Sequence, residues 1–463
     1  MSNTLYKIAR SWCEKESSVN STDEILAWIR ERNETVHVSI FKNRLEDSDA
    51  WLYDENEGRI CNKNRSFFSI SGFECRNADG ITVRQPIILQ MEIGYIGIIC
   101  KEIDGVMHFL MQAKIEPGNV NKVQISPTVQ ATKSNFMQLH GGARPPYLEY
   151  FLDAGHHEVV VDQVQSEQSS RFYQKRNRNV IIRVDEEVPV LATHRWMTLG
   201  QIKRLMREEN LVNMDARTGL SCIPFAKLRL TEAEWKELKN CFSDQMLYSS
   251  AFEETCANPL PQIYQYINNF KMFSEPVRQV IPLHQLSEWE MRDGEFVCKH
   301  PYPFKVVFCD ISIEGREVKR WTQPLFEAIG IATFGLLFCE DEGKLKFLVK
   351  AMPEVGCMDM LELGPTVQRE AVALSQEEDV VSKFFFECLA QKQGVIFDQL
   401  LSEEGGRFYH EQNRNVLLKV KREEIPDLPE GYFLLDYHTL NELVQINNTL
   451  NIQLRNLLVL LEA

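Results

Sequence analysis

Long hydrophobic runs, a signal peptide and paired cysteines are all missing from this sequence of 463 residues. The longest apolar runs, Ile93–Cys100 and Phe334–Cys339, fall far short of the roughly 18 residues that a membrane-spanning helix needs. The opening residues, MSNTLYKIARSWCEKES, contain no apolar signal-peptide core. The 12 cysteines show neither CxxC pairs nor zinc spacing, which is typical of reduced thiols. We therefore expect a cytoplasmic protein with no membrane segment.

Several catalytic signatures are also missing. HxH and HExxH do not occur, and the neighbours His156 and His157 point in different directions in any regular structure, so we predict no metal site. GxSxG, the P-loop and GxGxxG are absent as well. Serine hydrolases, P-loop NTPases and Rossmann dehydrogenases therefore lack their sequence signatures here.

Basic residues are fewer than acidic residues. The chain carries 51 Lys and Arg against 66 Asp and Glu, a net charge of −15. A general nucleic-acid binder needs clustered basic residues for phosphate contacts, so we expect no nucleic-acid partner. A small anionic ligand held by a few arginines stays possible. The length fits two or three domains, and 44% hydrophobic residues are ordinary for a globular protein.

What the sequence does contain is a repeat of itself. An offset of 238 residues (289 − 51), which becomes 236 (407 − 171) further on, aligns these segments: Trp51 with Trp289, Pro127–Gln130 with an identical Pro365–Gln368, Arg171–Tyr173 with Arg407–Tyr409, and Asn177–Val180 with Asn413–Val416. A register kept over this length indicates a tandem duplication. We predict two α+β modules, residues 1–248 and 249–463, with mixed sheets, hairpins and flanking helices.

Local patterns predict parts of each module. Ser21 and Glu24 form a capping-box pattern before a helix through Ile25, Trp28 and Ile29, and Thr231 with Glu234 repeats that pattern later. Asp104-Gly105 predicts a hairpin between strands at Tyr95–Lys101 and Val106–Ala113. Ser249–Gln262, with two prolines, has the composition of a linker.

One stretch of the first half, Met111–Gly142, is rich in side chains that bind ligands and transfer protons. Its prolines and Gly118 predict a loop after an apolar strand. The second half loses these polar groups, with the following replacements: Lys114 by Met352, Asn119 by Cys357, Ser134 by Val372 and Asn135 by Ala373, while His140 falls where the length changes. One working site beside a decayed copy explains the difference, and independent drift of two surface loops is the alternative.

The repeated RFY and NRNV segments allow two interpretations. Their Asn and Arg side chains either satisfy buried turn carbonyls or hold phosphates by forked hydrogen bonds beside an aromatic face. The phosphate interpretation concerns four residues: Arg171, Arg178, Arg407 and Arg414.

The segments QAKIEPGNVNKVQISPTVQATKSNFMQLHGG, PPYLEYF and RFYQKRNRNV resemble the NDP-hexose 2,3-dehydratases, and the resemblance covers nearly the whole chain. It implies two Nudix-like modules in one subunit, a homodimer, and loss of water across C2 and C3 of a dTDP-4-keto-6-deoxyhexose, without a cofactor. The product would be a 3,4-diketo-2,6-dideoxy sugar for a downstream NADPH-dependent 3-ketoreductase. The Nudix glutamate box is missing from both halves, which disfavours Mg²⁺-dependent pyrophosphate hydrolysis.

Roles follow from this resemblance as hypotheses. His140 is the expected base, with Glu116 as the competing candidate, and Lys114 or Tyr173 would steady the enolate or protonate the leaving hydroxyl. The expected substrate-binding residues are Asn119, Gln130, Thr132, Ser134, Asn135, Tyr147, Arg171, Asn177 and Arg178. Two rival interpretations are a non-catalytic nucleotide-sugar-binding protein and a divergent Nudix hydrolase.

Overall fold

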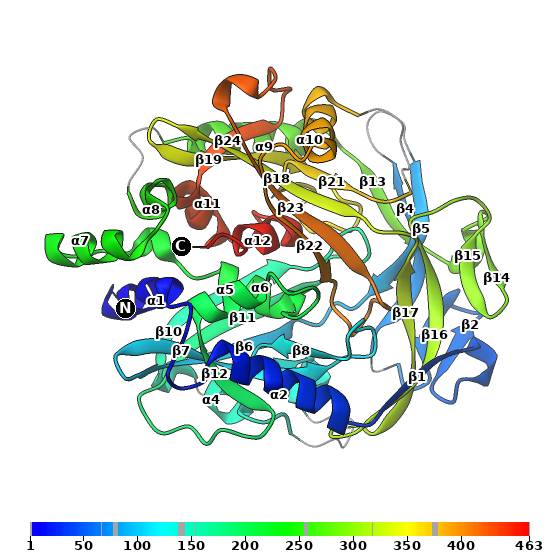
Figure 1. The fold of residues 1–463 in the computed structure, drawn as a ribbon. Helices are drawn as coiled ribbons and strands as arrows, with labels where there is room; N and C mark the ends of the chain where they lie inside the picture. The colour runs from blue at the N-terminus through cyan, green and yellow to red at the C-terminus, as the bar shows by residue number, and fades with distance from the viewer. Residues whose placement is uncertain are drawn as a thin grey trace.

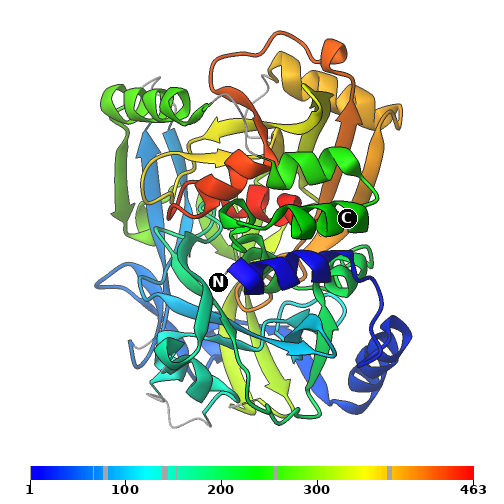
Figure 2. The ribbon, with the colours of Figure 1, turned by 90° about the vertical axis from the view of Figure 1, so that its left-hand side faces the viewer.

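The computed structural model describes residues 2–65, 67–76, 82–137, 144–152, 154–253, 258–316, 318–372 and 378–462. It is an α+β structure in which two similar halves lie one above the other, with helices between their sheets (Figures 1 and 2). The duplication predicted from the sequence is therefore confirmed. Among the described residues, no helix is both long and apolar enough to cross a membrane.

The first half begins with helix α1 (Ser2–Cys13), whose counterpart α8 (Gln245–Phe252) lies at the junction of the halves. Ser11 of α1 donates to the carbonyl of Met107, and Ser250 of α8 donates to the equivalent carbonyl of Leu345. The strands of the first half are β1 (Val38–Asn43), β2 (Trp51–Asp54), β3 (Arg59–Asn62), β4 (Ser69–Arg76), β5 (Thr82–Leu89), β6 (Gly94–Ile103), β7 (Val106–Ile115), β8 (Val123–Ser126), β9 (Val129–Ala131), β10 (Glu158–Ser166), β11 (Arg176–Arg183) and β12 (His194–Thr198). Its other helices are α2 (Thr22–Thr35), α3 (Lys133–Phe136), α4 (Leu148–Leu152), α5 (Leu199–Leu205), α6 (Met214–Ser221), α7 (Glu232–Cys241) and α8 (Gln245–Phe252).

The second half repeats this order from α9 onward. Its strands are β13 (Val277–Ile281), β14 (Trp289–Arg292), β15 (Glu295–Cys298), β16 (Phe304–Ile313), β17 (Arg320–Ala328), β18 (Thr333–Asp341), β19 (Lys344–Met352), β20 (Glu362–Gly364), β21 (Val367–Arg369), β22 (Val395–Ser402), β23 (Gln412–Val420) and β24 (Tyr432–Asp436). Its helices are α9 (Leu260–Phe273), α10 (Val380–Ala390), α11 (Tyr437–Val444) and α12 (Ile452–Leu458).

Each half carries a large mixed sheet. In the first half the order is β10-β11-β6-β7-β12, with β8 beside β7 and β9 beside β6, and the second half has the matching order β22-β23-β18-β19, with β24 and β20 beside β19 and β21 beside β18. The pairs β11–β6 and β23–β18 are parallel, whereas the other pairs in these sheets are antiparallel. This is a mixed sheet rather than an alternating βα sheet, as predicted.

The two smaller sheets exchange strands between the halves. Strand β1 of the first half pairs with β16 of the second, and β13 of the second half pairs with β4 of the first. Figure 1 shows β1 beside β16. The halves are therefore interlocked, and neither completes its small sheet alone.

The helices α5, α6, α11 and α12 lie between the two large sheets, and α6 packs on α12 (Figure 2). One buried core joins both halves: Trp12, Ile98 and Leu220 from the first half share it with Leu336 and Leu440 from the second. Burial of this apolar surface is the main force holding the halves together.

The local predictions fared unevenly. Both capping boxes are confirmed, at Ser21 before α2 and at Thr231 before α7. The hairpin is confirmed as well, since Asp104 and Gly105 have φ of 51° and 80° in the turn between β6 and β7. The linker prediction is wrong in its described part, because α8 and α9 occupy most of it. Pro259 and Pro261 lie at the start of α9, where proline is compatible with a helix.

Candidate active site

A cavity of about 290 Å³ opens at the edge of the large sheet of the first half, and both halves line it. We call it the first-half pocket. The first half supplies the ends of β6 and β7, the loop after β7 and the segment before β11. The second half supplies residues around β17 and residues 404–407, which we call the crossing loop. A pocket of this size between two units is where small-molecule sites usually lie.

A polar chain forms one wall of the pocket. The Nζ of Lys114 lies 3.2 Å from Oε1 of Glu116, and Gln130 donates its Nε2 to the same oxygen at 3.1 Å. Asn213, which caps helix α6, donates to Oε1 of Gln130 at 3.4 Å. The second carboxylate oxygen of Glu116 is buried and has no hydrogen-bond partner among the described residues. Glu116 thus keeps one oxygen for another group while the other is held in place.

The crossing loop packs tightly against the loop that follows β7. Gly118 donates its N–H to the carbonyl of Gly405 at 2.7 Å and accepts from the N–H of His410 at 2.8 Å. A Cβ at Gly118 would lie 1.5 Å from the carbonyl oxygen of Phe408, so only glycine allows this approach. Backbone contacts therefore hold the crossing loop of the second half in the wall of the first-half pocket.

Arg407 brings a buried positive charge to the pocket. Its Nε and Nη2 both donate to Oε1 of Gln90, at 3.2 and 3.0 Å, and its guanidinium lies over the rings of Phe67 and Phe68. Gln90 is neutral, so this hydrogen bond does not cancel the charge. Burial lowers the pKa of Arg407, while the carboxylate of Glu404 opposes that shift. An anion beside this guanidinium would be strongly attracted.

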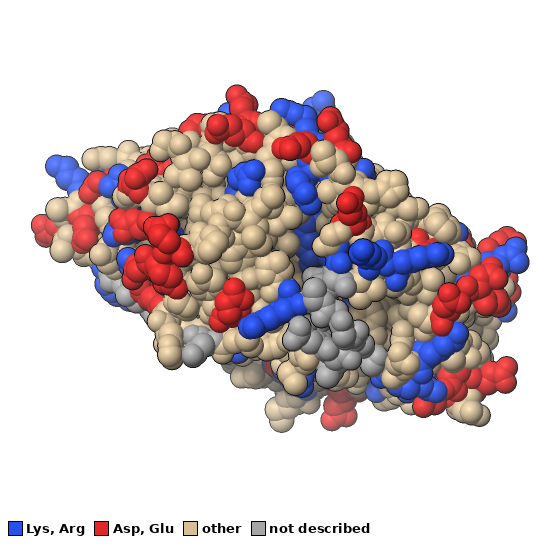
Figure 3. All heavy atoms as spheres, turned by 90° about the horizontal axis from the view of Figure 1, so that it is seen from below, with Lys and Arg blue, Asp and Glu red and all other residues tan. Residues whose placement is uncertain are grey.

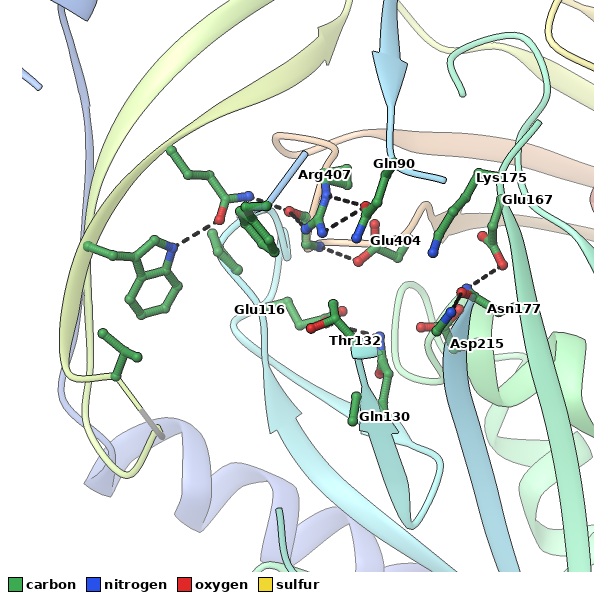
Figure 4. A pocket seen from close by; sticks show the side chains of 18 of the residues that line it. Gln90, Glu116, Gln130, Thr132, Glu167, Lys175, Asn177, Asp215, Glu404 and Arg407 are labelled. Atoms are coloured by element: carbon green, nitrogen blue, oxygen red, sulfur yellow. Dashed lines mark hydrogen bonds between the residues drawn. The ribbon is translucent and has the colours of Figure 1, made fainter. Parts of the chain in front are cut away.

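Four further charged side chains surround the same space (Figure 4). Burial lowers the pKa of Lys175 to about 8, although Glu167 partly offsets the shift. Burial, followed by the negative charge of Glu116, raises the pKa of Glu404 to about 7. Burial and the neighbouring carboxylates of Glu167 and Glu404 raise the pKa of Asp215 well above its ordinary value. The pocket therefore holds carboxyl groups that keep protons near neutral pH.

The opposite wall is aromatic and amide-rich. Trp51, Phe67 and Trp321 line it, with Gln323 among the polar groups between them. Trp321 donates its Nε1 to Oε1 of Gln323 at 2.9 Å, and Trp51 donates to the carbonyl of Thr322 at 2.7 Å. Flat rings beside hydrogen-bonding amides suit a nucleobase, because every base has a face that stacks.

Charge is unevenly spread over the molecular surface in spite of the overall negative balance. On the face in Figure 3, Lys and Arg side chains border a hollow near the centre, whereas groups of Asp and Glu lie towards the edges. Among the described residues no cluster of three or more His, Cys, Asp or Glu side chains has the geometry of a metal site.

Five residues predicted from the sequence line the first-half pocket: Lys114, Glu116, Gln130, Thr132 and Asn177. Asn177 donates to Oε1 of Glu167 at 2.7 Å and accepts from the N–H of Gly94 at 3.1 Å. His140 lies outside the described residues, as do the side chains of Ser134 and Asn135.

Five other predicted residues do not line the pocket. Arg171 occupies the equivalent place in the second half, and Arg178 forms a forked pair with Asp162 on an exposed edge. Tyr173 packs against Phe73, and Tyr147 donates its hydroxyl to the carbonyl of Pro189. Asn119 supports the loop after β7 by donating to the carbonyl of Lys122. The repeat explains the misplacement of Arg171, because Arg171 pairs with Glu370 of the second half while its equivalent Arg407 lines the first-half pocket.

Arg407 also lines the pocket and was named from the sequence as one of four phosphate candidates. Sequence reasoning missed other polar residues that line the pocket, among them Gln90, Lys175, Asp215 and Glu404. A signal for four of them was present. When the halves are aligned, Gln90, Lys175, Asp215 and Glu404 correspond to Ala328, Glu411, Gln453 and Gln168. These positions therefore differ between the halves, as Lys114 and Met352 do. Comparing the halves beyond the Met111–Gly142 stretch would have found them.

Comparison with known proteins gives a consistent result. The family model described as NDP-hexose 2,3-dehydratase matches the chain twice, over residues 22–223 and 260–461. A protein of Saccharopolyspora spinosa named dTDP-4-dehydro-6-deoxy-alpha-D-glucopyranose 2,3-dehydratase is 36% identical over 452 residues, which is 96% of this chain and 91% of the relative. Proteins with the same name are similar at 34% in Streptomyces violaceoruber, over 95% of this chain and 97% of the relative, and at 33% in Amycolatopsis orientalis, over 99% and 93%.

Proposed function

The chain belongs to the NDP-hexose 2,3-dehydratase family, and we propose that it removes water across C2 and C3 of a dTDP-4-keto-6-deoxyhexose. The observation that carries the proposal is the similarity of the whole chain, through both halves, to relatives named for this reaction. The product is a 3,4-diketo-2,6-dideoxy sugar. The activity is that of a hydro-lyase, which disfavours the rival interpretation of a non-catalytic binding protein.

The site assignment is a proposal about the first-half pocket. The C4 ketone acidifies the C3 proton, so the reaction needs a base, a donor to the developing enolate oxygen, and an acid for the leaving C2 hydroxyl. We propose Glu116 as the base, a role supported by its contacts: one of its oxygens is fixed by Lys114 and Gln130 and the other has no described partner. His140, the base expected from the sequence, lies outside the described residues and is the alternative. Lys114 supports the enolate oxygen.

Substrate binding is proposed to divide between the two ends of the pocket. Arg407 and Lys175 supply positive charge for the diphosphate, in place of the Arg171 and Arg178 expected from the sequence. The aromatic wall takes the thymine, and Thr132 and Asn177 contact the sugar. Under this proposal residues 1–248 carry the reaction, while residues 249–463 contribute the crossing loop and a diverged module.

The test mixes the purified protein with dTDP-4-keto-6-deoxyglucose in D₂O, without metal or NADPH, and follows the products by mass spectrometry. We expect loss of water, or free dTDP from collapse of the unstable diketo product. Unchanged sugar that still binds the protein would instead support the binding-protein interpretation.

The two candidate bases are separated by the variants Glu116→Gln and His140→Ala in the same assay. The variant of the true base should lose turnover by about a hundred- to ten-thousand-fold while retaining nucleotide binding. Near-normal turnover in both variants would contradict the assignment.

Nudix ancestry of each half is a further proposal, supported by the two mixed sheets. If the glutamate box is truly lost, added Mg²⁺ should leave the pyrophosphate of the dTDP-sugar intact. Cleavage would revive the hydrolase interpretation.

Homodimerisation is proposed through the second half. Met272, Phe273 and Val277 are 68%, 70% and 56% exposed, whereas the first half has polar residues at the equivalent positions. An apolar surface in one half only suggests a partner surface. Light scattering tests this, since a monomeric mass would contradict it.

The cellular context is proposed to be the cytoplasm, where an NADPH-dependent 3-ketoreductase consumes the unstable product. The described cysteines are free thiols, which suits a reducing compartment. Coupled turnover with such a reductase should consume NADPH only when this protein and its substrate are both present.

A further inference from the structure

We propose that Glu404, contributed by the second half, is the general acid that protonates the C2 hydroxyl as it leaves. The proposal rests on the dehydratase function proposed above and adds a residue to it. It makes the active site a joint product of both repeats. No residue of the first half alone then suffices for the elimination.

The position of Glu404 is the first support. Its side chain lines the first-half pocket and points into the space beside Glu116 (Figure 4). Its Oε1 accepts a hydrogen bond from the N–H of Gly406 at 2.9 Å, which fixes the carboxyl group. A carboxyl fixed on the opposite side of the space from Glu116 can act on a different atom of the same sugar. This arrangement lets the base and the acid of an elimination be separate groups.

The crossing loop is shaped to bring Glu404 there. A Cβ at Gly405 would lie 2.2 Å from Oδ1 of Asn119, and one at Gly406 would lie 2.1 Å from Oε1 of Glu404. Glycine at both positions therefore permits the close approach of the loop and the hydrogen bond to the carboxyl. The equivalent loop of the first half has Ser169 and Ser170 instead.

The counterpart of Glu404 gives independent support. Gln168 occupies this position in the first half, is only 2% exposed, and cannot donate an acidic proton. The carboxyl is thus present on the loop that enters the first-half pocket and absent from the loop that enters the equivalent place in the second half. Lys114 and Met352 differ between the halves in the same direction.

The charges around Glu404 allow it to hold a proton near neutral pH. Burial is the main cause of its raised pKa, with Glu116 and Glu167 adding to it and Arg407 and Lys114 opposing it. Two other groups respond to its charge: Asp215 on α6, and Lys175 before β11. The protonated acid is therefore available near neutral pH.

The step balances without another reactant. The base removes the C3 proton, and the electrons of that bond form the enolate of the C4 ketone. The C2–O bond then breaks as Glu404 gives its proton to the departing oxygen, which leaves as water, and a C2–C3 double bond forms. The resulting enol takes up a proton at C2 and loses one from the C3 hydroxyl to become the 3,4-diketone. Proton exchange with water returns both residues to their starting states.

The experiment uses Glu404→Gln, which keeps an acceptor for the N–H of Gly406 but has no acidic proton. In D₂O the variant should still exchange the C3 hydrogen at a rate within about tenfold of the parent. Its loss of water should fall by about a hundred- to ten-thousand-fold. The 2-deoxy-2-fluoro analogue of the substrate needs no acid, because fluoride leaves unprotonated. The variant should therefore release fluoride nearly as fast as the parent protein.

Other variants make the result decisive. Gly406→Ala should reproduce the defect in water loss by displacing the carboxyl, and Gln168→Glu should leave turnover unchanged. Full water loss in Glu404→Gln would overturn the proposal. So would equal loss of C3 exchange, water loss and fluoride release, because that pattern indicates a structural role. If Asp215→Asn alone loses water release but keeps fluoride release, the acid is Asp215. An inactive parent protein would refute the proposed function itself.

Discussion

The first-half pocket and the equivalent region of the second half differ in how their arginines are satisfied. Arg407 contacts the neutral Gln90, whereas Arg171 pairs with the carboxylate of Glu370 at 3.0 Å and lies over the ring of Phe304. Glu370 occupies the place of Thr132, and Ala328 that of Gln90. The second region neutralises its own cation, while the first leaves one available for a ligand. The duplication has kept the position of the charge and changed its use.

Some residues kept in both halves are structural. Thr128 and Thr366 each join two strands, accepting from the N–H of Ile99 and Leu337 respectively. Gln130 and Gln368 each donate to the glutamate of the loop after the central hairpin. At these positions identity between the halves marks the scaffold, whereas Lys114 and Glu404 differ between the halves.

The largest effect on turnover is expected when Lys114 is replaced by methionine, the residue at the equivalent position 352 of the second half. Lys114→Met removes the ammonium from Glu116 and from the enolate, so turnover should fall by about a hundred- to ten-thousand-fold. The assay in D₂O measures it, and circular dichroism checks folding. Met352→Lys is the matched control and should leave turnover unchanged. A folded Lys114→Met variant with full activity would show that the difference between the halves is drift.

A smaller effect is expected from the two arginines. Arg407→Lys loses the forked hydrogen bonds, and we expect KM to rise by about ten- to a hundredfold with a lesser change in kcat. Arg171→Lys alters the equivalent place in the second half and should affect stability rather than KM. If both variants raised KM equally, the second region would also take part in substrate binding.

The pH dependence of stability should depend on a buried position that is Gln in the first half and Glu in the second. Gln124 and Glu362 are equivalent; Gln124 donates to the hydroxyl of Ser402, while Glu362 accepts from that of Ser166 at 2.7 Å. Burial raises the pKa of Glu362 to about 8, so the folded state holds its proton more tightly than the unfolded chain. This contribution to stability is complete below about pH 4 and is lost as the pH rises to about 8.

Glu362→Gln removes that titration. Its free energy of unfolding should exceed that of the parent by about 1–2 kcal/mol at pH 8 and approach it at acidic pH. Urea unfolding at both pH values measures the difference. Gln124→Glu should show the opposite trend, and a parallel pH dependence of parent and variant would assign the titration to other groups.

Features of the fold and of the site that depend on neighbouring residues could be predicted from the sequence, whereas features that depend on contacts between the halves could not. The capping box at Ser21 and the turn at Asp104 rest on neighbouring residues and were predicted correctly. The exchange of β1 and β13 between the halves depends on pairing over more than two hundred residues, which no periodicity encodes. Arg171 was assigned to its own half for the same reason. Lys114 and Glu116 were found because they lie two residues apart at the end of β7, and Glu404 was missed because it comes from the other half.

The smallest effect should come from the residues that the two halves share most closely. Arg178 forms a forked pair with Asp162, and Arg414 forms the same pair with Asp398, each at 2.6–2.7 Å on an exposed edge. Exposed ion pairs contribute about 0–1 kcal/mol, so Arg178→Ala and Arg414→Ala should each change stability by no more than that and leave KM unaltered. Titration of substrate and thermal unfolding measure the two effects. A tenfold rise in KM for Arg178→Ala alone would move the phosphate site to the NRNV segment, and Arg407 would not bind the diphosphate.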